Sequence, residues 1–169
     1  SPESVKLAKT IADESTVLLK NENQLLPLDT KSLKSIAIIG PNADQVQFGD
    51  YTWSRNNKDG VTPLQGIKNR VNKNTAIHYA KGCSLTSLDT SGIAEAVEAA
   101  KNSEVAVIFG GSASAALARD YKSSTCGEGF DLNDLNLTGA QSQLIREVYR
   151  TGTPVILVLV TGKPFVIEW

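Results

Sequence analysis

Histidine and cysteine are scarce in this chain of 169 residues, which contains one histidine and two cysteines. The cysteines, Cys83 and Cys126, lie in separate segments, and neither belongs to a Cys/His cluster with the spacing of metal ligands. The sequence therefore predicts no metal site and no cofactor. We interpret the two cysteines as unrelated free thiols, with a disulfide as the alternative, and His78 as a structural residue of a predicted strand.

A charge excess and long apolar runs are absent too. Lysine and arginine number 17 against 18 acidic residues, a net charge of −1 without a basic stripe, so nucleic acid is not a predicted partner. The longest apolar runs, such as residues 155–160, are too short to cross a bilayer, so a membrane is not predicted either. The first residues lack the features of a signal peptide. The hydrophobic content of 41% is sufficient for one globular domain with a core.

Short apolar runs alternate with segments of helical periodicity along the chain. Buried strands are predicted at residues 35–40, 76–80, 105–110 and 155–160. Helices are predicted at residues 4–20, where one face is expected to be buried, from Pro63 onward, and at residues 93–100 and 138–149. Residues 166–169 are expected to start a further element. The alternation predicts a single α/β domain with a largely parallel sheet.

Three polar or glycine-rich loops follow the predicted strands: residues 40–44 with the segment after them, residues 110–134 and residues 161–164. Ligands bind such sheets at the carboxyl ends of their strands, and a loop as long as the second is usually functional or disordered. This loop carries Glu128 between Gly127 and Gly129, which leave the backbone free to adopt unusual angles. An acid placed there can donate a proton to a bound ligand. The alternatives are a solvated carboxylate without a role, or one of the neighbouring acids Asp120 and Asp131 in its place.

The loop after the first predicted strand carries two aromatic residues and an acid, namely Asp50, Tyr51 and Trp53. An exposed aromatic face beside hydrogen-bonding side chains suits a sugar ring, whose C–H face packs while its hydroxyls pair. The alternative is that both aromatics only cover the core. Residues 40–44 are not a phosphate-binding loop, because they lack G-x-G-x-x-G and contain Pro41 where a phosphate needs an amide. We therefore interpret them as a plain turn at a strand end.

A series of motifs extends over nearly the whole chain. They are residues 12–28, 36–44, 49–51, 61–67, 79–83, 127–131, 135–141, 151–154 and 162–164. In this order they resemble the second, α/β-sandwich domain of glycoside hydrolase family 3, the β-glucosidase and β-xylosidase family. Two residues depart from the family pattern: Leu132 stands where an arginine is frequent, so a loop-ordering ion pair is expected to be missing, and Thr138 stands where a proline is common.

The resemblance implies a three-layer α/β/α sandwich, truncated at its C-terminal end, in a retaining glycosidase. Two carboxylates then flank the glycosidic bond about 5–5.5 Å apart. By the motif, Glu128 is the catalytic general acid/base, whereas the nucleophile is an aspartate on a preceding (β/α)8-type barrel that these residues do not include. Tyr51 is the candidate for stacking on the aglycone-side sugar, and Trp53 and Asp50 are candidates for the same rim.

The resemblance also implies the partners of the domain. We expect an exo-acting β-glycosidase on plant-derived oligosaccharides, periplasmic or secreted, whose barrel packs on residues 1–169. Alone, this part is expected to be inactive and to expose its barrel-facing side, which favours a homo-oligomer. A non-catalytic carbohydrate-binding or barrel-packing module is the main alternative, and a nucleotide-binding domain is disfavoured by the missing phosphate motif. The preference for glucose, xylose or another sugar stays open.

Overall fold

Four parallel strands form the sheet of this chain, whose computed structural model describes residues 1–49, 51–52, 60–114, 125–129, 131 and 133–167. The strands are β1 (Ser35–Ile39), β2 (Ala76–Ala80), β3 (Val105–Gly111) and β4 (Val155–Val160), in the order β2-β1-β3-β4. Every neighbouring pair is parallel, with Ile38 beside both Tyr79 and Val107. The prediction of four parallel strands is confirmed, for β2 and β4 with the same bounds. Their predicted burial is correct for the central strands β1 and β3 but wrong for the edge strands, because β4 is half-buried and β2 exposes Ala76 and Tyr79.

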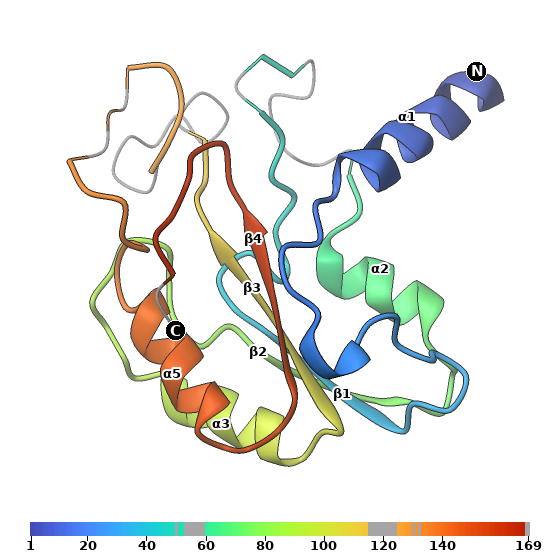
Figure 1. Ribbon diagram of the computed structural model, residues 1–169, viewed down its shortest axis with the longest axis vertical. Helices are drawn as coiled ribbons and strands as arrows, with labels where there is room; N and C mark the ends of the chain where they lie inside the picture. The colour runs from blue at the N-terminus through green and yellow to red at the C-terminus, as the bar shows by residue number, and fades with distance from the viewer. Residues whose placement is uncertain (50, 53–59, 115–124, 130, 132, 168–169) are drawn as a thin grey trace.

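Helices α3 (Ile93–Lys101) and α5 (Gln141–Tyr149) cover one face of the sheet (Figure 1). Small residues of the central strands, such as Ala37 and Ala106, pack there against alanines of α3 and the buried face of α5. Successive side chains of a strand point to opposite faces of the sheet, so the residues next in sequence to Ala37 and Ala106 face the other side. This alternation gives the sheet two separate hydrophobic clusters.

The opposite face packs against α2 (Pro63–Arg70) and apolar residues of the segment before β1. Ile36, Ile38 and Phe109 point to this side and belong to one hydrophobic cluster with Leu64 of α2. Helix α2 begins where the sequence predicts it, because Thr62 accepts a hydrogen bond from the Gln65 amide at 3.2 Å and Pro63 fits the first turn. The fold is therefore the α/β/α sandwich that the sequence predicts.

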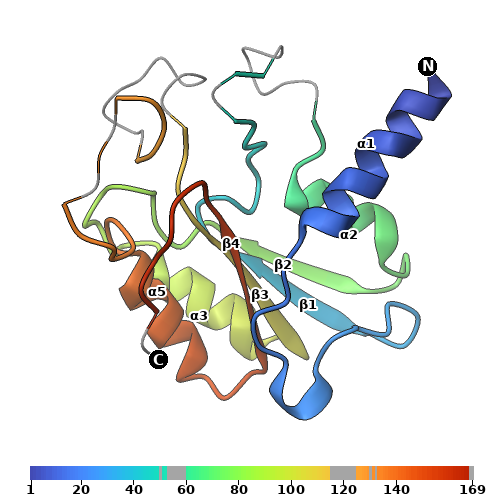
Figure 2. The ribbon, with the colours of Figure 1, turned by 45° about the horizontal axis from the view of Figure 1, so that its top comes forward.

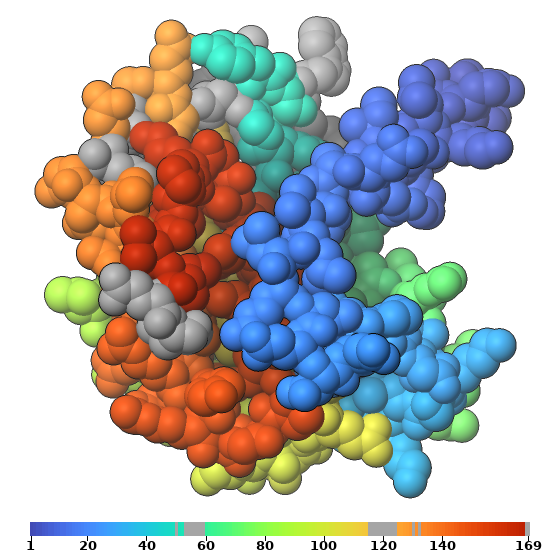
Figure 3. Space-filling view, viewed as in Figure 1, coloured from blue at the N-terminus to red at the C-terminus, as the bar shows by residue number. Residues whose placement is uncertain are grey.

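Helix α1 (Pro2–Ser15) differs from its prediction in length and in burial. None of its residues is buried, and Val5, Leu7 and Ile11 are all more than half exposed. Figures 1 and 2 show the helix extending away from the sheet, and in Figure 3 it stands out from the body of the molecule. Periodicity indicates which side of a helix is apolar, but burial also needs a surface to pack on. Other segments already cover both faces of this sheet.

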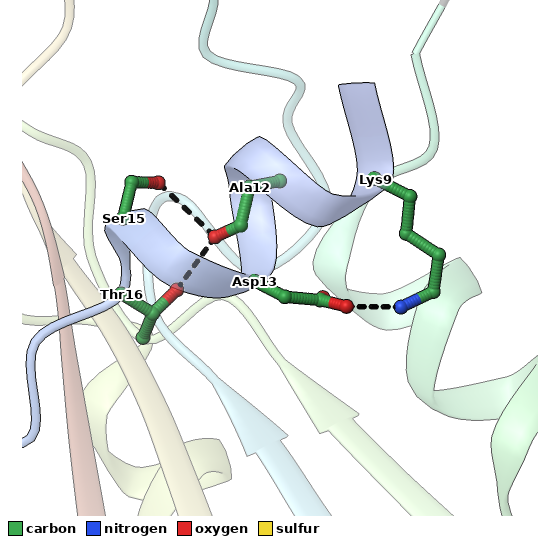
Figure 4. A network of polar contacts seen from close by, with 5 residues as sticks. All are labelled: Lys9, Ala12, Asp13, Ser15 and Thr16. Carbon is green, nitrogen blue, oxygen red and sulfur yellow. Dashed lines mark hydrogen bonds and ion pairs between the residues drawn. The ribbon is translucent and has the colours of Figure 1, made fainter. Parts of the chain in front are cut away.

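Helix α1 ends at Ser15, where two side-chain hydroxyls bind one carbonyl of its last turn (Figure 4). The hydroxyls of Ser15 and Thr16 both donate to the Ala12 carbonyl oxygen, at 3.0 and 3.2 Å, and Thr16 has extended backbone angles. An ion pair between Lys9 and Asp13 lies one turn earlier. The predicted continuation to residue 20 is therefore wrong.

Two predictions at the C-terminal end also need correction. Helix α5 begins at Gln141 rather than at Thr138, because residues 139 and 140 form a turn before it. Residues 166 and 167 belong to no helix or strand, and residues 168–169 lie outside the described part. Across the described residues, none of the helices is both long and apolar enough to span a membrane.

Cys83 lies in the cluster beneath α3 and α5, and Cys126 is buried elsewhere, both as free thiols. The interpretation as unpaired cysteines is confirmed. Burial raises the pKa of the Cys83 thiol to about 11, from an ordinary value of 9.0, against the opposing charge effect of Lys81. The folded protein thus holds this proton at a pH where the unfolded chain releases it.

We expect the stabilising contribution of Cys83 to be complete below about pH 9 and to disappear as the pH rises toward 11. The sign follows because unfolding releases the thiol proton in that range, so alkali favours the unfolded state. Urea unfolding of wild type and Cys83→Ala, at about pH 8 and about pH 10.5, measures the effect. The difference in unfolding free energy between the two proteins should narrow at the higher pH. A constant difference contradicts the prediction.

Candidate active site

Loops from three strands meet at the carboxyl edge of the sheet and enclose a pocket of about 440 Å³. Residues 47–49 after β1 form one wall. Ser112, Ser114, Cys126 and Gly127, after β3, form the second, and the third consists of residues 160–163 at the end of β4. These loops lie together beyond the same ends of the strands (Figure 1). The predicted convergence of the three loops at this edge is confirmed.

Two fully buried amide side chains, one after β1 and one at the start of α5, hold the end of β3. Asn42 donates from Nδ2 to the carbonyl oxygens of Gly110 and Ser112, at 3.3 and 3.2 Å. Gln141 accepts from the Gly111 amide at 2.9 Å and donates to the Gly111 carbonyl oxygen at 3.0 Å. The peptide group between Gly110 and Gly111 is thus bound by both side chains, at its carbonyl by Asn42 and at its amide by Gln141. The loop that carries Glu128 departs from a fixed strand end.

The described ends of the long loop are joined to each other just before Glu128. The Thr125 amide donates to the Ala113 carbonyl oxygen at 2.9 Å, and the Thr125 hydroxyl accepts from the Ala113 amide at 3.1 Å. Ser114 and Cys126 form an isolated parallel bridge beside them. This junction sets the position from which residues 127–129 extend.

Glu128 is exposed at the carboxyl edge, between two glycines with left-handed backbone angles. Gly127 has φ of 119° and Gly129 has φ of 79°, values that side-chain-bearing residues rarely adopt. The predicted need for glycine on both sides of the acid is confirmed. Of the rival acids, Asp131 is also exposed, whereas Asp120 lies outside the described residues.

Tyr51 reaches Glu128 from the neighbouring loop, 77 residues away in the sequence. Its hydroxyl donates a hydrogen bond to Glu128 Oε2. The tyrosine is 83% exposed, so the alternative that it only covers the core is wrong. The other two candidates for the sugar-binding rim, Asp50 and Trp53, lie outside the described residues.

The turn at residues 40–44 does more than end a strand. Asn42 Oδ1 accepts from Gln47 Nε2 at 2.8 Å, which ties the turn to a residue of the pocket wall. Asp44 accepts from the Thr62 hydroxyl at 2.8 Å, just before α2. The histidine and the acidic residues bear on the predictions of a structural role and of no metal site. His78 lies in β2, as predicted. In the described segments, no three His, Cys, Asp or Glu side chains gather into a group that could hold a metal ion.

Comparison with known proteins extends the argument beyond this chain. A β-xylosidase from Formosa agariphila is 39% identical over 170 residues, which cover 97% of this chain and 22% of the relative. A periplasmic β-glucosidase from Salmonella typhimurium is 36% identical over 94% of this chain and 22% of its own length. This chain therefore spans about a fifth of the length of these relatives.

A solved structure gives the same result for the fold. The β-glucosidase from Erythrobacter marinus matches with a TM-score of 0.80 at 30% identity, over 98% of this chain and 24% of that chain. Residues 16–169 match the model of the glycosyl hydrolase family 3 C-terminal domain. The sheet, the covering helices and the motifs along it agree with that match, and the chain belongs to glycosyl hydrolase family 3.

Proposed function

We propose that this chain is the acid/base-bearing domain of a retaining, exo-acting β-glycosidase. The observation that carries the proposal is the position of Glu128, exposed on a glycine-flanked loop beside a pocket at the carboxyl edge of the sheet. The proposed substrates are plant-derived oligosaccharides with terminal β-D-glucosyl or β-D-xylosyl residues. The names of the β-xylosidase and β-glucosidase relatives support this range of sugars.

Glu128 serves the two steps of the reaction in opposite protonation states. In the first step its carboxyl proton passes to the glycosidic oxygen while the bond from that oxygen to the anomeric carbon breaks. A second carboxylate bonds to the anomeric carbon, and the aglycone leaves as an alcohol. In the second step a water oxygen bonds to the anomeric carbon and its proton passes to Glu128, while the bond to the second carboxylate breaks. Both carboxyl groups then regain their first states.

The second carboxylate, as we propose, is an aspartate of the barrel that precedes this domain. The exposed ring of Tyr51, beside Glu128, suits stacking on the sugar at the aglycone side. Asp50 and Trp53 are proposed for the same rim because they flank this tyrosine in the sequence. The chain alone is then half of an active site, and hydrolysis requires the longer enzyme.

Azide tests the role of Glu128 in the full-length enzyme. In Glu128→Ala, water cannot lose its proton to the side chain, whereas azide needs no base. We expect azide to accelerate turnover of an activated aryl glycoside and to yield a glycosyl azide of retained configuration, because both displacements invert.

The matched control is Asp131→Ala, which removes an exposed acid from the same loop. This variant should keep its hydrolytic rate and form no glycosyl azide. If Glu128→Ala retains the wild-type rate without azide, the acid/base assignment of Glu128 is wrong, and if Asp131→Ala also retains it, neither of these two acids is used.

A further inference from the structure

We propose that the hydroxyl of Tyr51 is a positioning group for the carboxyl of Glu128, in addition to the ring's role as a sugar platform. This inference rests on the proposed function, since it concerns the acid/base of that reaction. The observation behind it is the hydrogen bond from the Tyr51 hydroxyl to Glu128 Oε2. It joins loops that follow two different strands, β1 and β3.

Backbone geometry alone leaves the Glu128 side chain poorly constrained. The flanking glycines place the residue at the exposed turn of a loop, and glycine restricts its neighbours less than other residues do. An acid/base must hold its oxygen within hydrogen-bond reach of the glycosidic oxygen, and small displacements of such a group are costly for catalysis. A contact from a separate loop supplies the missing restraint on the carboxyl group.

The loop that carries Tyr51 is itself anchored. Gln47, four residues before Tyr51, donates to buried Asn42, and Asn42 also holds the end of β3. Glu128 follows the junction of Thr125 with Ala113 at the end of that strand. Both partners of the hydrogen bond thus extend from walls of the pocket that are fixed to the same strand end.

A tyrosine hydroxyl suits a carboxyl group that gains and loses a proton in each cycle. It donates to Glu128 Oε2 both when the side chain is ionised and when the carboxyl proton lies on the other oxygen, Oε1, from which it can pass to the glycosidic oxygen. The same contact can therefore persist through both steps. Phenylalanine keeps the ring for a sugar but removes this contact, so Tyr51→Phe separates the two roles.

The test compares, in the full-length enzyme, how much Tyr51→Phe lowers kcat/KM for substrates with poor and with good leaving groups. Aryl glycosides with poor leaving groups need protonation by Glu128, whereas 2,4-dinitrophenolate is a good leaving group and departs without protonation. We expect kcat/KM for phenyl glycosides to fall roughly tenfold or more, the effect of losing a hydrogen bond to a charged group. The value for the dinitrophenyl glycoside should change less than about twofold.

Tyr149→Phe is the matched control, because Tyr149 is an exposed tyrosine of α5. Tyr149→Phe should leave kcat/KM unchanged for both the phenyl and the dinitrophenyl glycoside. An equal loss on both substrates, or no loss on either, overturns the positioning role of Tyr51. Glu128→Ala, measured in parallel, keeps the two proposals apart. If the loss of kcat/KM in Glu128→Ala is the same for both leaving groups, the proposed function fails. If Glu128→Ala loses more on the phenyl glycoside but Tyr51→Phe loses equally on both substrates, only the role of Tyr51 is refuted.

Discussion

Replacing Glu128 with alanine is expected to lower kcat/KM of the full-length enzyme for unactivated disaccharides by roughly 10²–10⁴-fold. This range is what a general acid contributes when it protonates a poor leaving group. The side chain is exposed, at the turn between two glycines, so its removal leaves no cavity and no unpaired buried group. The loss should therefore arise in the chemistry rather than in folding.

Initial rates on cellobiose or xylobiose measure this effect, and a thermal unfolding midpoint close to that of the wild type verifies the fold. Glu128→Gln is the shape-matched variant and should lose a similar factor, because an amide cannot supply the proton. An activated dinitrophenyl glycoside should show a burst, since loss of the base slows hydrolysis of the covalent intermediate. A Glu128→Gln variant with the wild-type rate on disaccharides would refute the acid/base role.

Replacing Gly111 with alanine is expected to destabilise the domain by about 4 kcal/mol. Gly111 has φ of +118°, and a Cβ there would lie 2.2 Å from the Val160 carbonyl oxygen, on the backbone of the paired strand. Strained backbone angles cost roughly 1–3 kcal/mol, and forced displacement of packed atoms costs roughly 1–3 kcal/mol more. Native domains are stable by roughly 5–15 kcal/mol, so the variant should lose a large part of its stability.

Gly162→Ala is the matched control, since Gly162 lines the same pocket and a Cβ there meets no atom within 4 Å. Equilibrium urea unfolding of both variants measures the difference. We expect the midpoint of Gly162→Ala to stay near that of the wild type and that of Gly111→Ala to fall sharply. Equal midpoints would show that the end of β4 can move away from β3 at little cost.

The sheet could be predicted because β1, β3 and β4 are largely continuous apolar runs, a pattern typical of parallel sheets. The α1 helix shows the limit of such patterns. Its apolar side is real, but Val5 and Leu7 stay exposed because no described segment covers them. Periodicity in the sequence indicates the apolar side of a helix but not whether another segment packs against that side.

The site could be predicted only where local sequence determines it. Glu128 is marked by its two glycines, whose φ angles follow from their place in the loop. The buried amides escaped prediction, because Asn42 binds carbonyls 68 and 70 residues away and Gln141 binds Gly111 at a distance of 30 residues. Thr138 was noted only as a departure from a common proline. Its hydroxyl donates to the Leu85 carbonyl oxygen at 2.6 Å, a bond that proline cannot make.

The junction of Thr125 with Ala113 has a consequence for how such domains diversify. The chain leaves the sheet beside Ala113 and Ser114 and returns to the same place at Thr125 and Cys126. The intervening stretch can then be lengthened, shortened or exchanged in evolution without displacing Glu128. A designer who grafts a segment of another length between these two pairs is expected to leave the backbone around Glu128 in place.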